Sequence, residues 1–390
     1  MNRSARARMC VGHVILVVLV SAACGGGAGQ QAAQPSEPTS QMAERPEPDQ
    51  LPGDGIEITM ARANWSSEYI AAEIYRQILT ELGYNVSNPA DIEVGPGRAY
   101  EAMAQGTVDF WANGWIPAHL SWFQVELPDG STVGDHLDYI GDGVRDAGVQ
   151  GFLITKSWAD RNGVRSIDQI NADPALIAQL DENDANPGSG VWDLFGCEET
   201  WTCDDIIDSM IAYYGWTQVV QTRGAYDEMF AEFLRLVREE APTVIYTWAP
   251  SDYLAQAVPG AEVLWLTMHP DRLLDDSNPL GVTGGEHFQQ RSGFTGFGAA
   301  TCTQPCQLGW DTSDLHVVAN KAFLLANPVL VSLFERIRPD AIDLQALAVE
   351  QARGDGSQEH LAQLASRWRT DNEELIDGWI ADALASSQGS

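Results

Sequence analysis

The sequence predicts an α/β protein of two lobes, in which each lobe is a mainly parallel sheet flanked by helices. Strand-like and helix-like hydrophobic patterns alternate from residue 56 onward, which is typical of a parallel sheet with helices on its faces. The chain has 390 residues. About 335 of them follow the N-terminal leader and linker, which is more than one hydrophobic core usually holds. Two lobes are therefore expected.

The N-terminus has the pattern of an export signal. Three arginines within the first eight residues precede an apolar run at residues 11–20 and small residues at 21–23. The run is too short to span a bilayer as a stable helix, so residues 1–23 are predicted to be a removable signal peptide. Cys24 follows directly and resembles the lipid-bearing cysteine of the bacterial lipobox, which implies lipidation at Cys24. Secretion without an anchor is the alternative.

Residues 24–52 are expected to form a flexible linker that carries the lipid anchor, because they are rich in Gly, Gln, Pro and Glu and almost free of apolar side chains. The folded part is expected to divide into three segments. They are the first segment of lobe 1 at residues 53–150, lobe 2 at residues 151–262, and a return to lobe 1 with C-terminal helices at residues 263–390.

Hydrophobic spacing places the elements of the first lobe in order. Ile70, Ile74 and Ile78 fall on one face of a helix that Gly83 ends. The expected order is a strand at 56–60, this helix, a strand region at 86–92, a short helix at 99–106 and a strand at 107–115. Ligands of such sheets gather at the carboxyl ends of the strands. The loop that begins near Trp115 lies at such an end.

The second lobe is expected to begin near Gly151. Its clearest elements are a helix at 204–215 and an apolar run that ends near residue 248. Segments at 262–270 and 315–325 are expected to lead back to the first lobe. The last sixty residues have helical spacing, in which Trp368 and Trp379 are predicted to be core residues.

Charge and cysteine usage restrict the function classes. The net charge of −33 at pH 7 argues against nucleic acid as a partner. Beyond residue 24 the four cysteines form two close pairs, Cys197 with Cys203 and Cys302 with Cys306, which read as local disulfides in an exported protein. Each bridge is worth about 2 kcal/mol through chain entropy. A four-cysteine zinc site is the alternative, although the spacing matches no common zinc module.

No catalytic motif is complete. Pro187 fills the first glycine position of a Gly-x-Ser-x-Gly elbow, and Gly141 and Gly143 lack the third glycine of a dinucleotide loop. The sequence therefore predicts no enzyme, no catalytic residue, no cofactor and no metal. The alternative from another class is a secreted hydrolase or metal-binding enzyme that uses His119 with a cysteine or an acid.

Five segments together resemble one protein family. They are GWIPAH at 114–119, GCEETWTCDD at 196–205, VIYTWAP at 244–250, EVLWL at 262–266 and LHVVANKAF at 315–323. In this order they are similar to the glycine betaine/proline betaine substrate-binding proteins of ABC importers, and the similarity covers most of residues 51–385. The resemblance implies a two-lobed clamshell of the periplasmic binding protein type (type II), with the ligand trapped between the lobes.

The resemblance also implies an aromatic box for the ligand's cationic head. Trp115 is expected from the first lobe, Trp201 and Trp248 are expected from the second, and Trp65 is a possible extra contact. A trimethylammonium group has no N–H to donate, so ring faces are the surfaces that attract its diffuse charge and bury its methyl groups. Tryptophans held on rigid loops suit this task.

The ligand's carboxylate is expected at the other end of the site. The resemblance assigns it to the side chain of His119 and to the backbone N–H groups of Thr202 and Cys203. Close relatives often carry glycine at the position of Thr202. They also carry an aromatic pair where Ser251 and Asp252 stand here, and the Cys302–Cys306 loop is an addition to the simplest family pattern.

The function implied by the resemblance is solute capture for transport. We expect a monomeric receptor at the periplasmic or outer cell surface, held to the membrane by a lipid, that binds a betaine as an osmoprotectant. It would hand this ligand to a membrane permease that works with a separate ATPase subunit. A receptor of the same fold for choline or carnitine is the alternative.

Overall fold

One eight-stranded sheet runs through both lobes in this computed structural model, which describes residues 51–268 and 298–387. Seven strands follow one another in the order β2-β4-β10-β5-β8-β6-β7, and β9 pairs with β5 beside this path. In that order the bounds are Met60–Ala61, Phe110–Ile116, Ser313–Asn320, Leu137–Thr155, Val244–Ala249, Trp192–Phe195 and Val219–Thr222, with β9 at Val263–Trp265.

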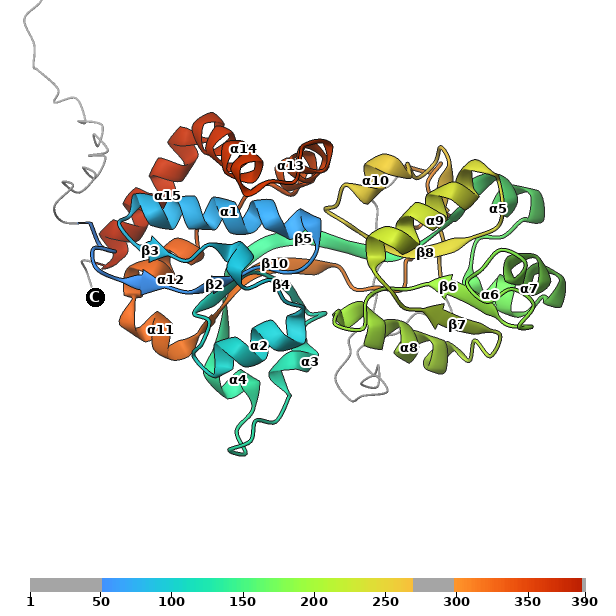
Figure 1. Ribbon diagram of the computed structural model, residues 1–390, viewed down its shortest axis with the longest axis horizontal. Helices are drawn as coiled ribbons and strands as arrows, with labels where there is room; N and C mark the ends of the chain where they lie inside the picture. Colours follow the sequence, from blue (N-terminus) through green and yellow to red (C-terminus); the bar gives the residue numbers. More distant parts are fainter. Residues whose placement is uncertain (1–50, 269–297, 388–390) are drawn as a thin grey trace, which may run out of the picture. The chain divides into compact units, whose positions relative to one another are not determined.

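Strand β5 is the element that the two lobes share (Figure 1). Its first part, up to Gly148, pairs with β10, and its second part, from Val149, pairs with β8. The predicted boundary between residues 150 and 151 thus falls inside a continuous strand of 19 residues. β9 pairs with the end of β5 on the edge opposite β8, so the chain is still in the second lobe at Trp265.

The α/β class and the two lobes are as predicted, but the sheet is mixed and not mainly parallel. β2–β4, β6–β7 and β6–β8 are parallel pairs. β10 runs antiparallel to both β4 and β5, and β5 runs antiparallel to β8 and β9. Hydrophobic alternation marks a strand but does not give its direction, which is why the sequence missed this.

The first lobe contains the expected helix α1 (Ser66–Glu81), which buries Ile70, Ile74 and Ile78. Gly83 follows it with φ 88°, a conformation that favours glycine, and the predicted helix end is confirmed. The expected strand at 107–115 is β4, which continues to Ile116 and therefore contains Trp115. The other elements are β1 (Glu57–Ile58), β3 (Asn85–Val86), a 3-10 turn (Pro89–Asp91), α2 (Pro96–Ala104), α3 (Leu120–Phe123) and α4 (Val133–His136).

The second lobe surrounds β6, β7 and β8 with helices. The predicted helix at 204–215 is α8, which begins two residues earlier (Thr202–Tyr214). The remaining helices are α5 (Lys156–Asn162), α6 (Ile167–Asn171), α7 (Pro174–Asp181), α9 (Tyr226–Arg238) and α10 (Tyr253–Gln256).

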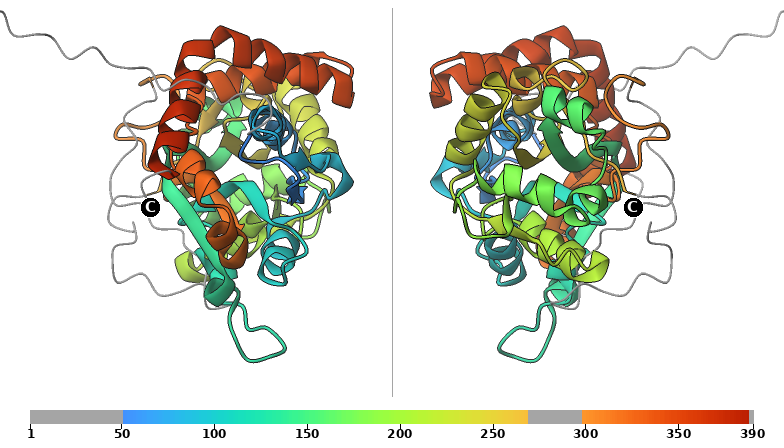
Figure 2. Two further views of the ribbon diagram at one scale, coloured as in Figure 1. Left: turned by 90° about the vertical axis from the view of Figure 1, so that its left-hand side faces the viewer. Right: turned by 90° about the vertical axis from the view of Figure 1, so that its right-hand side faces the viewer.

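The C-terminal residues are helical, as predicted, and pack on the first lobe (Figure 2). α13 (Ala341–Arg353) and α14 (Gln358–Asp371) lie against α1, and α15 (Glu373–Ser387) lies against α12 (Pro328–Phe334), which follows α11 (Lys321–Ala326). Trp368 is buried and Trp379 is partly buried against the core, so both core predictions are confirmed.

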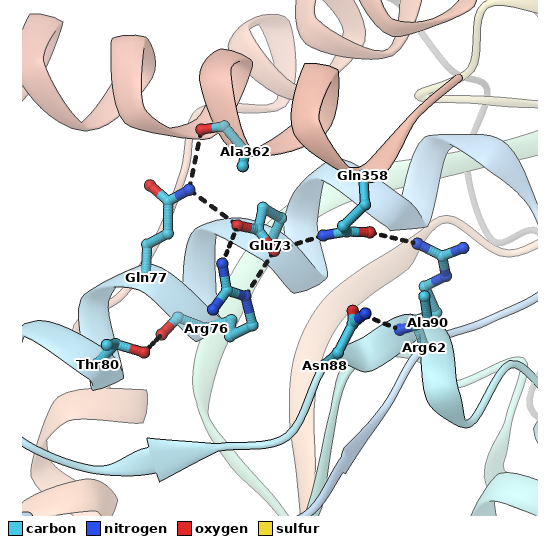
Figure 3. Close-up of polar contacts among 9 residues, drawn as sticks. All are labelled: Arg62, Glu73, Arg76, Gln77, Thr80, Asn88, Ala90, Gln358 and Ala362. Carbon is cyan, nitrogen blue, oxygen red and sulfur yellow. Dashed lines mark hydrogen bonds and ion pairs between the residues drawn. The ribbon is translucent and has the colours of Figure 1, made fainter. Parts of the chain in front are cut away.

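A buried carboxylate ties α14 to α1 (Figure 3). Glu73 accepts hydrogen bonds from Arg76 at 2.7 Å, from Gln77 at 2.9 Å and from Gln358 of α14 at 3.0 Å. Gln77 also donates to the carbonyl of Ala362. This network fixes α1, and Trp65, one of the first lobe's two cavity-lining tryptophans, directly precedes the first turn of that helix.

The predicted signal peptide, the lipidation site Cys24 and nearly all of the linker lie outside the described residues. Within residues 51–268 and 298–387, none of the helices has the length and apolar character needed to cross a membrane.

Candidate functional site

A cavity lies between the two lobes and is lined from both. About 380 Å³ of space not filled by atoms lies between its walls, part of it open to solvent. All seven predicted ligand-contacting residues line it, together with four that were not predicted. The lining residues are Trp65, Pro96, Trp115, Ala118 and His119 from the first lobe, Gln150 from β5, and Trp201, Thr202, Cys203, Tyr246 and Trp248 from the second lobe.

The four cavity tryptophans stand at the ends of regular elements. Trp65 and Trp201 are the residues that precede the first turns of α1 and α8. Trp115 is the penultimate residue of β4, and Trp248 is the penultimate residue of β8. Because the helices and strands are fixed by the core, each ring is held by a rigid element rather than by a free loop.

The rings meet at steep angles. The Trp201 ring centroid lies 5.4 Å from that of Trp65, with 73° between the planes, and 5.4 Å from that of Trp248, with 89° between the planes. Tyr246 lies nearly parallel to Trp248, with its ring centroid 5.9 Å away. Rings at near right angles form the corner of an aromatic enclosure.

The polar edges of three cavity tryptophans are bonded to acceptors that do not line the cavity. Trp201 Nε1 donates to Asn64 Oδ1 at 2.8 Å, and Trp248 Nε1 donates to Ser67 Oγ at 3.4 Å. Trp115 Nε1 donates to the side-chain oxygen of Asn113. These three indole N–H groups therefore bond to residues outside the cavity, and the rings contribute mainly carbon surface to it.

His119 lines the cavity and keeps one ring nitrogen as a hydrogen-bond donor. The backbone N–H of Trp115 donates to Nδ1 of His119 at 3.2 Å, so Nδ1 is an acceptor and the proton of the neutral ring sits on Nε2. The ring is packed between Trp111 and Tyr100. Burial lowers the pKa of His119 to about 3, which keeps the imidazole neutral at physiological pH.

The backbone amides of Thr202 and Cys203 are the first two of helix α8. Neither amide donates to an acceptor within the described part of the chain, as is usual for the first turn of a helix. These N–H groups and the helix dipole favour a negatively charged group at this point. The nearby carboxylate of Asp204 is paired with Arg223 at 2.6 Å, which reduces its repulsion of an anion.

The Cys197–Cys203 disulfide closes the loop that carries Trp201 and these amides, with 6.4 Å between the two Cα atoms. Cys302 and Cys306 form the second disulfide, and neither lines the cavity between the lobes. The four sulfurs therefore pair as expected from the sequence, and not as a four-cysteine zinc site.

Comparison with known proteins places the chain in a family. Residues 56–371 match the family described as the substrate-binding domain of ABC-type glycine betaine transport systems. The chain belongs to this family. Its members are substrate-binding components of transporters and not enzymes.

The family contains relatives that cover nearly the whole chain. The glycine betaine/proline betaine-binding periplasmic protein of Escherichia coli (strain K12) is 27% identical over 340 residues, which are 87% of this chain and 93% of that protein. The solved structure of lactococcal OpuAC in its closed-liganded conformation with glycine betaine has a TM-score of 0.56 at 15% identity, covering 83% of this chain and 99% of that one. A choline-binding protein of an ABC transporter, in complex with choline, has a TM-score of 0.58 at 14% identity and covers 88% of this chain and 99% of that one. These structures confirm the two-lobed periplasmic binding protein fold.

Sequence reasoning missed two polar or aromatic residues that line this cavity. Tyr246 precedes Trp248 by two positions in β8, so both side chains lie on the same face of the strand, and this spacing could have revealed it. Gln150 of β5 is the cross-strand partner of Trp248, and its Oε1 accepts from the Tyr246 hydroxyl at 2.7 Å. No local sequence pattern predicts that Gln150 lines the cavity, because its position there depends on the pairing of β5 with β8.

Proposed function

We propose that this chain is the extracytoplasmic receptor of an ABC importer and that it binds glycine betaine, or a closely related betaine, in the cavity between its lobes. The observation that carries the proposal is that one cavity contains two kinds of binding group, one for a cation and one for an anion. Aromatic walls and unpaired N–H donors line the same small space.

The aromatic walls suit a quaternary ammonium group. Such a cation cannot donate a hydrogen bond, so an acceptor oxygen gives it no selectivity over ammonium, whereas ring surface attracts its charge and buries its methyl groups. Trp65, Trp115, Trp201, Trp248 and Tyr246 supply this surface. The bonding of three indole N–H groups to outside acceptors supports the same assignment.

The donors suit a carboxylate. His119 offers Nε2–H, and the start of α8 offers the N–H groups of Thr202 and Cys203. A betaine carries a carboxylate at one end and a trimethylammonium group at the other, and it satisfies both ends of the cavity. Choline has no carboxylate and would leave these donors unpaired, which costs affinity in a buried site.

The binding free energy expected from the aromatic rings alone is too small for micromolar affinity, so closure of the lobes must contribute. Cation–ring contacts contribute about 0.5–2 kcal/mol each, whereas micromolar affinity needs about 8 kcal/mol. Methyl burial, carboxylate hydrogen bonds and the exclusion of water by closure must supply the rest. The Cys197–Cys203 bridge reduces the ordering cost because it presets Trp201 and the amides beside it.

The role in transport follows from this binding. The receptor closes on the betaine, docks on a membrane permease driven by a separate ATPase, and releases the ligand there, without catalysis. We propose that it acts as a monomer at the periplasmic or outer cell surface and that a lipid on Cys24 holds it to the membrane.

A calorimetric panel of glycine betaine, proline betaine, choline, carnitine and proline tests the proposal. We expect glycine betaine or proline betaine to bind most tightly, to change the tryptophan fluorescence and to raise the melting temperature by mass action. Tighter binding of choline than of every betaine contradicts the betaine assignment. Binding of none of the five contradicts the receptor function.

A further inference from the structure

The disulfide loop of the second lobe, residues 197–203, lies against the first lobe at three places. Asn64 Nδ2 donates to Glu198 Oε2 at 3.1 Å. Trp122 Nε1 donates to Thr202 Oγ1 at 2.8 Å. Between them the backbone at Gly95 approaches Thr200 so closely that an added Cβ would lie 2.5 Å from the Thr200 carbonyl oxygen.

Asn64 makes two of the bonds that cross to this loop, one with each end of its amide. Its Nδ2 bonds to Glu198, and its Oδ1 accepts from the indole N–H of Trp201 at 2.8 Å. Asn64 itself does not line the cavity. Its neighbour Trp65 does, and the Trp65 ring stands against that of Trp201.

The two bonds depend on lobe closure. Asn64 precedes α1 of the first lobe, whereas Glu198 and Trp201 belong to the loop before α8 of the second lobe. Separation of the lobes would expose all three groups to water, and their bonds would be lost together. The free energy of these bonds therefore contributes to the closed form and not to the open form.

We propose that Asn64 is an affinity-determining positioning residue, which holds the disulfide loop on the first lobe and sets the Trp201 ring over the ligand without touching it. This inference rests on the proposed function. It assigns the control of ligand release to a side chain outside the cavity. Most of its effect falls on the dissociation rate, because the bonds must break before the lobes can part.

Replacement of Asn64 tests the proposal in the purified protein with glycine betaine as the probe. Asn64→Ala removes both bonds, and we expect binding to weaken about tenfold. Stopped-flow tryptophan fluorescence should assign most of this loss to faster dissociation. The melting temperature without ligand should stay within a few degrees of the unchanged protein, because the half-buried Asn64 is not part of the core.

A designed pair separates positioning from a general structural effect. Asn64→Asp keeps an acceptor for Trp201 but places a second carboxylate beside Glu198, and it should weaken binding at least as much as Asn64→Ala. Glu198→Gln alone keeps an acceptor for Asn64 and should change affinity less than threefold. Glu198→Gln combined with Asn64→Asp restores a donor–acceptor pair, and it should recover most of the lost affinity.

The Asn85–Glu57 pair is a matched control. Asn85 Nδ2 donates to the two carboxylate oxygens of Glu57 at 2.7 and 2.6 Å, within the first lobe and away from the cavity. Asn85→Asp makes the same chemical change as Asn64→Asp and should leave affinity and dissociation rate unchanged.

The outcomes distinguish the two proposals. If the unchanged protein binds betaine and Asn64→Ala dissociates within twofold of its rate, the role of Asn64 is refuted and the receptor function stands. Failure of the double variant to recover affinity also refutes the positioning role. If the unchanged protein binds no member of the ligand panel, the receptor function and the inference fall together.

Discussion

The backbone N–H of Trp115 donates to Nδ1 of His119, so one cavity residue determines where another carries its proton. Trp115 and His119 are four positions apart, and the carbonyl of Trp115 also accepts from the backbone N–H of His119 at 2.7 Å. The end of β4 and the turn after it thus bring an aromatic ring and a residue with a ring N–H donor to the same cavity. A zwitterion needs both at a fixed separation.

Replacement of His119 should therefore separate ligands by their charge. We expect His119→Ala to weaken glycine betaine binding at least tenfold and choline binding less than threefold, because only the betaine has a carboxylate to lose a donor. Calorimetry with both ligands measures the difference. Equal losses for the two ligands contradict the carboxylate role.

The affinity of the unchanged protein for betaine should hardly depend on pH between 6 and 8. The pKa of His119 is lowered to about 3 by burial, so the ring is neutral throughout this range and donates from Nε2 without taking up a proton. Titrations at three pH values should agree within twofold. A steady gain in affinity as the pH falls would mean that the ring is protonated on binding.

Trp201→Ala should weaken betaine binding at least tenfold and leave the fold intact, because it removes the ring between Trp65 and Trp248. Fluorescence titration and thermal melting measure the two effects. Trp379→Ala is the opposite case, since Trp379 packs against the core away from the cavity, and it should lower the melting temperature but not the affinity. An affinity within twofold for Trp201→Ala refutes the aromatic box.

Glu68 should make the protein less stable as the pH rises. This fully buried carboxyl has a pKa well above its ordinary value of 4.5, chiefly because burial penalises its charge, while Arg62 and Asn113 oppose the shift. Above pH 4.5 the unfolded chain therefore releases this proton before the folded chain does, and stability is lost as the pH rises.

Glu68→Gln removes this titration and should be more stable than the unchanged protein at pH 8, by about 1–3 kcal/mol, with a smaller gain at pH 5. Urea unfolding at both pH values measures the gain. Glu374→Gln at an exposed position is the control and should change nothing. A gain that is equal at both pH values rules out the charge as its cause.

The two disulfides should differ in their effect on binding. Replacing Cys197 and Cys203 by serine frees the loop that carries Trp201, and we expect affinity to fall roughly fivefold, since more ordering then accompanies binding. Replacing Cys302 and Cys306 should leave affinity within twofold. Each pair contributes about 2 kcal/mol to stability, so thermal melting provides the common reference.

The sequence predicted the cavity residues best where they lie at or near the ends of strands and helices. Trp115 and Trp248 each follow an apolar strand pattern, and Trp201 stands between two cysteines, so local spacing and the family resemblance led to them. The structure brings all of them to one cavity. Their role as ligand contacts remains the proposal that the variants test.

What the sequence could not give depends on contacts between distant segments. Gln150 reaches the cavity because β5 pairs with β8, and Asn64 meets Glu198 because the two lobes are in contact there. The antiparallel pairing of β10 with β4 and β5, and of β5 with β8 and β9, makes the sheet mixed, and hydrophobic alternation carries no information on strand direction.

Two tryptophans of the second lobe are held in place by hydrogen bonds to the first lobe. Trp201 and Trp248 belong to the second lobe, yet their indole N–H groups are bonded to Asn64 and Ser67 of the first. Separation of the two lobes would therefore break these bonds and free the Trp201 and Trp248 rings as well as open the cavity. A permease that separates the lobes would not need a higher affinity for the ligand than the receptor has, because the same movement removes the surface that binds it.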